Sequence, residues 1–134
     1  MFVATYIPLG GAYVMKKMNK EAVDAFQRAS MFSNGHPIAV AGLGYTAAVF
    51  GRREEAVMML DLLKERRKDE YVSAYWIAAV HCGLGEKSRA LQWLQKAYSE
   101  RDGYMIFLDV EPIFDPLRSD PQFALLLKKV GLSS

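Results

Sequence analysis

The side chains that could carry out catalysis or hold a metal are few in this 134-residue sequence. Its two histidines, His36 and His81, are far apart along the chain, and neither is at metal-ligand spacing from a cysteine or a carboxylate. Cys82, the single cysteine, follows His81 directly, so on a helix the two side chains point about 100° apart. We interpret His81 as a core residue and Cys82 as a small apolar one, with a reactive thiol as the alternative for Cys82. We therefore expect no enzyme, no metal site and no cofactor.

Two other patterns could indicate phosphate or nucleic-acid binding, and each has a simpler interpretation. Gly83-Leu84-Gly85 lacks the following glycine and the preceding strand of a phosphate loop, so it predicts a turn between helices. Charges of alternating sign in residues 52–55 and 64–70 are typical of a solvated helix face. Because 17 basic residues balance 15 acidic ones, composition also gives no sign of a nucleic-acid partner.

Composition places the chain among ordinary folded domains. A hydrophobic content of 51% and a net charge of +2 exclude an intrinsically disordered chain. One cysteine cannot form an internal disulfide, so nothing indicates an oxidising compartment and we expect a cytoplasmic protein. Residues 29–51 lack charge, but polar residues fill their first third, so we expect no membrane span. No basic residue precedes the N-terminal apolar stretch, so we expect no secretory signal.

The charged residues are confined to alternate segments. Residues 1–15, 29–51 and 71–85 contain no Asp, Glu, Lys or Arg. The apolar and the polar surfaces of the fold must therefore come from different segments of the chain.

The sequence repeats with a period of 34 residues, which is typical of a helical repeat protein. Alanines keep this interval across the chain, and small residues and larger apolar residues keep the same phase. These positions are Ala22, Ala56, Ala90 and Ala124, then Gly10, Gly44 and Ala78, then Phe26, Leu60 and Leu94. Small residues at facing positions would let two antiparallel helices approach closely.

Helical periodicity predicts a pair of helices in each repeat and no strand. The predicted helices span residues 8–17 and 20–32, 37–50 and 53–68, and 71–82 and 87–101. Asn19 is the predicted N-cap of the second helix, Pro37 suits a first helical position, and Gly51 predicts a turn. One pair cannot bury its own apolar face, so each pair must stack on the next.

These positions resemble the tetratricopeptide repeat (TPR) family, whose first helix carries an aromatic residue, Leu-Gly and Tyr, and whose second carries A-x3-F. The matching positions are Tyr6, Leu9, Gly10, Tyr13, Ala22 and Phe26, then Val40, Leu43, Gly44, Ala47, Ala56 and Leu60, then Ala74, Ile77, Ala78, His81, Ala90 and Leu94. The resemblance covers about residues 3–104. It implies an all-α fold, a right-handed α-solenoid of three TPR pairs at about 3–36, 37–70 and 71–104, within a single domain 1–134.

The remaining segment, 105–134, is predicted to be a degenerate capping unit. Pro112 prevents a full first helix, so only a short helix over about 104–110 is expected. Ser119-Asp120-Pro121 predicts a capped start for a final helix, which Gly131 ends. Residues 114–123 also resemble the C-terminal end of bacterial TPR-bearing signalling proteins.

The TPR resemblance implies that the first helix of each pair lines a concave groove, and that this groove is almost free of charge. No Lys, Arg or Asn lies on the inward stripe, so a clamp for a partner's carboxylate is not expected. The predicted peptide-binding residues are Ile7, Val14, Ile38, Ala41, Tyr45, Ala48, Val72, Tyr75 and Ala79. The alternative is that this stripe is core between repeats, or is covered by residues 105–107.

We therefore expect a protein-interaction scaffold that binds an apolar peptide or helix, without nucleic-acid or membrane partners. The alternative is an oligomerisation or regulatory domain cut from a larger bacterial signalling protein. Self-association is also possible, because the chain begins with apolar residues almost in phase with a repeat. The expectation is that it is the C-terminal part of a longer protein, or that its N-terminal face forms a dimer.

Overall fold

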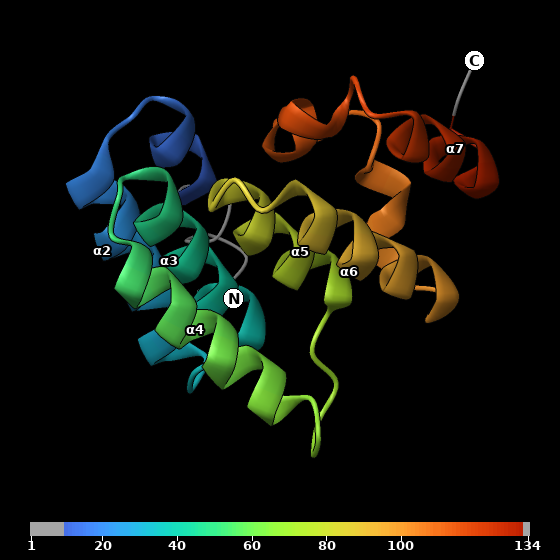
Figure 1. Ribbon diagram of the computed structural model, residues 1–134. Coiled ribbons are helices and arrows are strands. Elements are labelled where there is room, and N and C mark those ends of the chain that lie inside the picture. Colours follow the sequence, from blue (N-terminus) through green and yellow to red (C-terminus); the bar gives the residue numbers. More distant parts are fainter. Residues whose placement is uncertain (1–9, 133–134) are drawn as a thin grey trace. The chain divides into compact units, whose positions relative to one another are not determined.

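The computed structural model describes residues 10–132, in which all regular secondary structure is helical (Figure 1). The predicted all-α class is confirmed for this part of the chain. Two compact units are present, residues 1–72 and residues 73–134, called here the first and second unit. Each is described by itself, and the single domain over 1–134 stays a prediction.

The first unit contains three complete described helices after a helical stretch at residues 10–15. These are α2 (Asn19–Phe32), α3 (Pro37–Val49) and α4 (Arg53–Arg66). In sequence order each packs on the next, α2 on α3 and α3 on α4. The predicted helix boundaries agree to within one or two residues, because the turn signals lie at the ends of the apolar periodicity.

Local chemistry explains most of these boundaries. Pro37 occupies the first turn of α3, and His36 Nδ1 accepts a hydrogen bond from the Ile38 amide at 3.1 Å. Gly51 has φ +86°, the left-handed conformation that favours glycine between α3 and α4. The predicted N-cap at Asn19 is wrong: Asn19 is the first helical residue, and its Oδ1 accepts from Arg52 Nη1 at 2.8 Å.

The second unit pairs two helices and covers them with a C-terminal segment. Its elements are α5 (Ala74–Gly83), α6 (Lys87–Ser99), the 3-10 helices η1 (Gly103–Phe107) and η2 (Pro112–Leu117), and α7 (Pro121–Val130). Both α5 and α6 contact η2, and α6 also contacts α7. α5 begins three residues later than predicted because Ser73 caps it, accepting from the Trp76 amide at 3.4 Å.

The C-terminal segment matches the prediction at its last helix and departs from it before that. Asp120 caps α7 by accepting from the Gln122 amide at 2.8 Å, and Gly131 ends the helix with φ +87°. The short helix expected over 104–110 is the five-residue η1, and the second short helix, η2, was not predicted.

The 34-residue phase marks buried positions in the three helix pairs. Its small and large apolar members are buried, and this confirms the predicted packing positions: Gly10, Gly44 and Ala78, Ala22, Ala56 and Ala90, and Phe26, Leu60 and Leu94. Ala124 keeps the interval but is exposed on α7. The packing repeat therefore does not extend into the final helix.

Two glycines allow the closest packing in the first unit. A Cβ atom on Gly10 would lie 2.7 Å from the Phe26 ring, and one on Gly42 would lie closer still to the same ring. Phe26 is buried, so its ring can fit between these helices only if both positions lack a side chain. The repeat pattern pointed to Gly10, whereas Gly42 lies outside the phase and was not predicted.

Gly42→Ala should therefore destabilise the first unit by about 1–2 kcal/mol, because the clash with Phe26 outweighs the better helix propensity of alanine. Gly11→Ala is the matched control: a Cβ there meets no atom of the described residues within 4 Å, so stability should rise by about 0.5–1 kcal/mol. Urea denaturation followed by circular dichroism measures both changes. A gain in stability for Gly42→Ala would contradict the packing described here.

Candidate functional site

The predicted peptide-binding residues differ in their exposure. Ile7 lies outside the described residues. Five of the others have 5% or less of their surface exposed: Val14, Ala41, Val72, Tyr75 and Ala79. The remaining three, all on α3, are half-buried: Ile38, Tyr45 and Ala48.

In the second unit the predicted binding face of α5 is covered by the chain's own η2. The Tyr75 ring packs edge-on against Phe114 of η2, with centroids 5.2 Å apart, and Phe114 is fully buried. The Cys82 thiol donates to the Ile113 carbonyl at 3.3 Å. Tyr75 and Ala79 thus contribute to the core of this unit. η2 supplies most of this cover, and of residues 105–107 only Met105 is buried, in the same core cluster as Tyr75 and Ala79.

Tyr75 is a packing residue and not a reactive one. Its ring also contacts Trp76 and stacks on Tyr104, at centroid distances of 5.0 and 5.9 Å. Its hydroxyl has no hydrogen-bond partner among the described residues. Burial raises the pKa of Tyr75 well above its ordinary value, and the carboxylates of Glu111 and Asp102 act in the same direction. The phenol therefore stays protonated.

A buried carboxylate joins the start of α5 to η1. Asp102 is 5% exposed and accepts from Ser73 Oγ at 2.6 Å, the Tyr104 amide at 3.0 Å and the Tyr75 amide at 3.5 Å. These donors satisfy the charge and hold the two helix starts together. This role was not predicted from the sequence because Asp102 follows the charged, exposed end of α6. An aspartate directly before the first residue of a short helix was the available signal.

His81 and Cys82 both occupy core positions, as predicted. His81 is 1% exposed, and its Nδ1 lies 2.8 Å from Glu86 Oε1. Burial raises the pKa of the Cys82 thiol to about 11, against a weaker opposing effect of Lys87. Within residues 10–132 no group of three or more His, Cys, Asp or Glu residues could hold a metal ion. No helix in the same range is long and apolar enough to cross a membrane.

Cys82 should react slowly while the protein is folded. Raising its pKa from 9.0 to about 11 lowers the thiolate fraction at pH 8 roughly a hundredfold, so alkylation by iodoacetamide should slow at least that much relative to the chain in urea.

The same pKa shift of Cys82 makes stability depend on pH. Between pH 9 and 11 the unfolded chain loses the thiol proton and the folded chain keeps it. The free energy of unfolding should therefore fall as the pH rises through this window, and less so in Cys82→Ala. Rapid alkylation of the folded chain would contradict the burial.

The α3 face of the first unit remains partly accessible. Ile38, Tyr45 and Ala48 lie at spacings of 7 and 10 residues, which places them on the same side of the helix. Tyr45 also packs on the small core formed by Val14, Ala22 and Phe26. α3 carries no Asp, Glu, Lys or Arg, so this face can offer a partner only apolar and weakly polar contacts.

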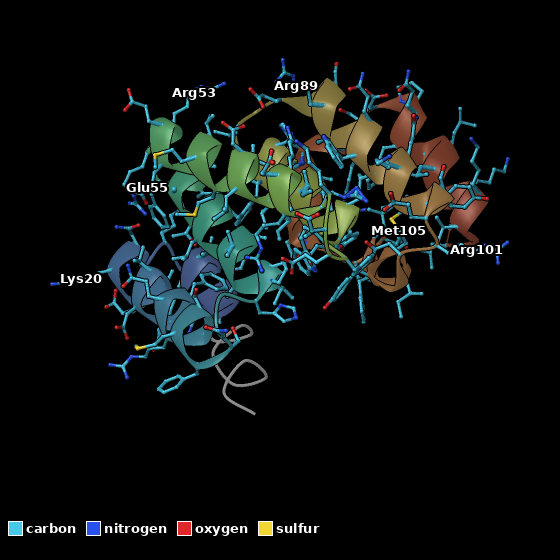
Figure 2. All side chains as sticks on the ribbon, turned by 90° about the horizontal axis from the view of Figure 1, so that it is seen from below. Lys20, Arg53, Glu55, Arg89, Arg101 and Met105 are labelled. Atoms are coloured by element: carbon cyan, nitrogen blue, oxygen red, sulfur yellow. The ribbon has the colours of Figure 1, made fainter. Side chains whose placement is uncertain are left out.

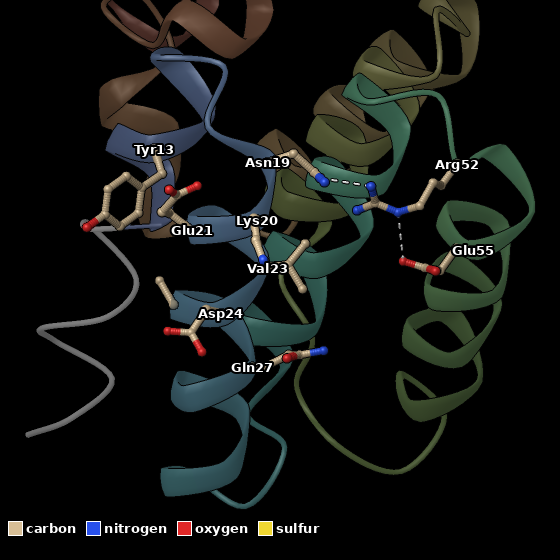
Figure 3. Close-up of a pocket in the computed structure, with 10 residues that line it drawn as sticks. Tyr13, Asn19, Lys20, Glu21, Val23, Asp24, Gln27, Arg52 and Glu55 are labelled. Atoms are coloured by element: carbon tan, nitrogen blue, oxygen red, sulfur yellow. Dashed lines mark hydrogen bonds and ion pairs between the residues drawn. The ribbon is translucent and has the colours of Figure 1, made fainter.

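An open cleft of about 720 Å³ lies on another part of the first unit, beside α2 (Figure 3). Lys20, Glu21 and Asp24 line it from α2, and Arg52 and Glu55 line it from the start of α4. Arg52 donates to Asn19 and pairs with Glu55 at 3.3 Å, so its guanidinium is already engaged. The cleft has charges of both signs, and neither histidine nor the cysteine is among its lining residues.

Several charged side chains project outward in each unit. Figure 2 shows Lys20 and Arg53 pointing away from the ribbon of the first unit, and Arg89 and Arg101 from that of the second. The second unit also exposes an apolar patch on and after η1, where Ile106, Phe107 and Val110 are 64%, 48% and 73% exposed.

Comparison with family models, with curated proteins and with solved structures gave no match.

Proposed function

We propose that this chain is a protein-interaction module of TPR-like helix pairs, and that it binds an apolar peptide or helix on the α3 face of the first unit. The observation that carries this proposal is the difference between two corresponding helices. η2 covers α5, whereas Ile38, Tyr45 and Ala48 of α3 stay partly exposed without any charge beside them on that helix.

The magnitude of the binding follows from the side chains that are available. Fully burying one Ile or Val side chain contributes roughly 1.5–3 kcal/mol to the free energy of binding. Ile38, Tyr45 and Ala48 are already half-buried, so each contributes less than a fully exposed side chain would. Three such contacts, after the entropic cost of association, support an affinity in the micromolar to millimolar range. A right-handed solenoid and a cytoplasmic location belong to the same proposal, supported by the 34-residue phase and the single buried cysteine.

Selection from a displayed peptide library on the intact chain, followed by fluorescence polarisation of the selected peptides, tests the proposal. Ala48→Arg should weaken binding at least about tenfold, since it places a charge on the apolar face. Tyr45→Glu should weaken it as well, although Tyr45 also packs in the core, so Ala48→Arg is the cleaner variant. Tyr98→Glu is the control, because Tyr98 is exposed on α6 of the other unit.

Two results would overturn the proposal. One is a selection that yields no binding peptide, and the other is a set of peptides that bind the Ala48→Arg chain as well as the unaltered chain. Circular dichroism of each variant separates lost binding from lost folding. The alternative function, an oligomerisation or regulatory domain, predicts instead that Ala48→Arg changes the oligomeric mass and leaves no peptide affinity to measure.

A further inference from the structure

α4 exposes apolar side chains on the side opposite its buried face. Met58 and Leu62, one turn apart, are 67% and 46% exposed. Ala56, Leu60 and Leu63 of the same helix are buried and lie about half a turn around from that pair. The fold of the first unit therefore uses one face of α4 and leaves Met58 and Leu62 outside the core.

Every carboxylate of α4 lies within one turn of this exposed pair. Glu54 and Glu55 precede Met58 by four and three residues. Asp61 follows Met58 by three residues, and Glu65 follows Leu62 by three residues. All four are exposed. Two have partners on the same chain, Glu55 with Arg52 at 3.3 Å and Glu65 with Lys68 at 3.0 Å.

Arg66, which follows the exposed pair on the same helix, is directed elsewhere. Arg66 follows Leu62 by four residues, but its guanidinium donates to Glu70 and to the Gly35 carbonyl, at 3.0 and 2.7 Å. The surface around Met58 and Leu62 is therefore apolar at its centre and has four carboxylates at its edge, of which Glu55 and Glu65 are paired with Arg52 and Lys68. It will be called the α4 acidic face, defined by Glu54, Glu55, Met58, Asp61, Leu62 and Glu65.

α7 presents the opposite combination. Leu125 is 59% exposed, and Lys128 and Lys129 lie one turn further along the same helix, both exposed. Phe123 and Leu126 are buried in the core of the second unit, and α7 contains no acidic residue. This surface will be called the α7 basic face, defined by Leu125, Lys128 and Lys129.

We propose that the α4 acidic face of one copy binds the α7 basic face of a second copy. Leu125 would cover Met58 and Leu62, while the two lysines approach Asp61 and Glu65, so that apolar surface is buried and unlike charges meet. The two faces differ, and each copy carries one of each, so two copies can form this contact once, or twice about a two-fold axis. This inference is independent of the α3 face and of the proposed function.

The contact is small and charged, so the association should be weak and sensitive to salt. Sedimentation equilibrium of the full chain should show a mass that rises with concentration toward about 1 mM, and that rises less in 0.5 M salt than in 0.05 M salt.

Charge reversal tests which faces meet. The chain with Asp61→Lys and Glu65→Lys, and the chain with Lys128→Glu and Lys129→Glu, should each associate about tenfold more weakly than the unaltered chain. Mixing these two chains, or combining all four substitutions in one chain, should restore association because each reversed face again meets its opposite. Glu21→Lys with Asp24→Lys is the matched control on α2 and should leave association unchanged.

Three outcomes would overturn the inference. These are a monomer at every concentration, an unchanged mass after either reversal, and a failure of the combined reversals to restore association. An α7 helix that packed on α4 of its own chain would give the first of these. Ala48→Arg should leave the mass unchanged and the charge reversals should leave peptide affinity unchanged, so failure of this contact is distinguishable from failure of the α3 site.

Discussion

Phe114→Ala should destabilise the second unit by about 3–5 kcal/mol. Phe114 is fully buried, and the centroids of its ring and of the Tyr75 ring lie 5.2 Å apart. The substitution therefore removes a large apolar contact and leaves a cavity between η2 and α5. A loss of this size is a large fraction of the stability of a small domain. Removing the Phe114 side chain should therefore expose the α5 face only if the second unit also unfolds.

Tryptophan fluorescence during urea denaturation measures this effect selectively, because both tryptophans, Trp76 and Trp93, lie in the second unit. Phe107→Ala is the matched control: Phe107 is on η1, is 48% exposed, and should change the free energy of unfolding by less than about 1 kcal/mol. Equal effects of the two substitutions would show that η2 is not part of the core.

Asp102→Ala should destabilise the same unit by about 3 kcal/mol. The substitution leaves the Ser73 hydroxyl and the Tyr104 amide without their acceptor, and each unsatisfied buried donor costs about 1–3 kcal/mol. Asp102→Asn should be milder, because the amide retains one oxygen that can accept. The loss should appear in the same fluorescence measurement, since Trp76 lies at the start of α5.

Asp109→Ala provides the comparison for Asp102. Asp109 is exposed and pairs with Arg118 at 3.5 Å, a surface ion pair worth less than about 1 kcal/mol. Each substitution removes an aspartate carboxylate, and the two positions are seven residues apart in the sequence. If they destabilise the second unit equally, Asp102 does not hold the starts of α5 and η1 together.

The helices and most of the residues that pack between them could be predicted from the sequence. Proline fixes φ and glycine permits a positive φ, so Pro37, Gly51 and Gly131 predicted helix boundaries without knowledge of the fold. The 34-residue phase likewise identified buried positions, because a repeated helix pair places equivalent residues in equivalent packing.

Which apolar surfaces stay accessible depends on how the helices pack in three dimensions. The same uncharged pattern is half-buried on α3 and fully covered on α5, since η2 returns to α5 and burial depends on contacts distant in sequence. Asp102, Gly42 and the α4 acidic face were missed for the same reason. A charge, a glycine or an exposed methionine acquires its role from its neighbours in space, and helical periodicity describes only its neighbours along the chain.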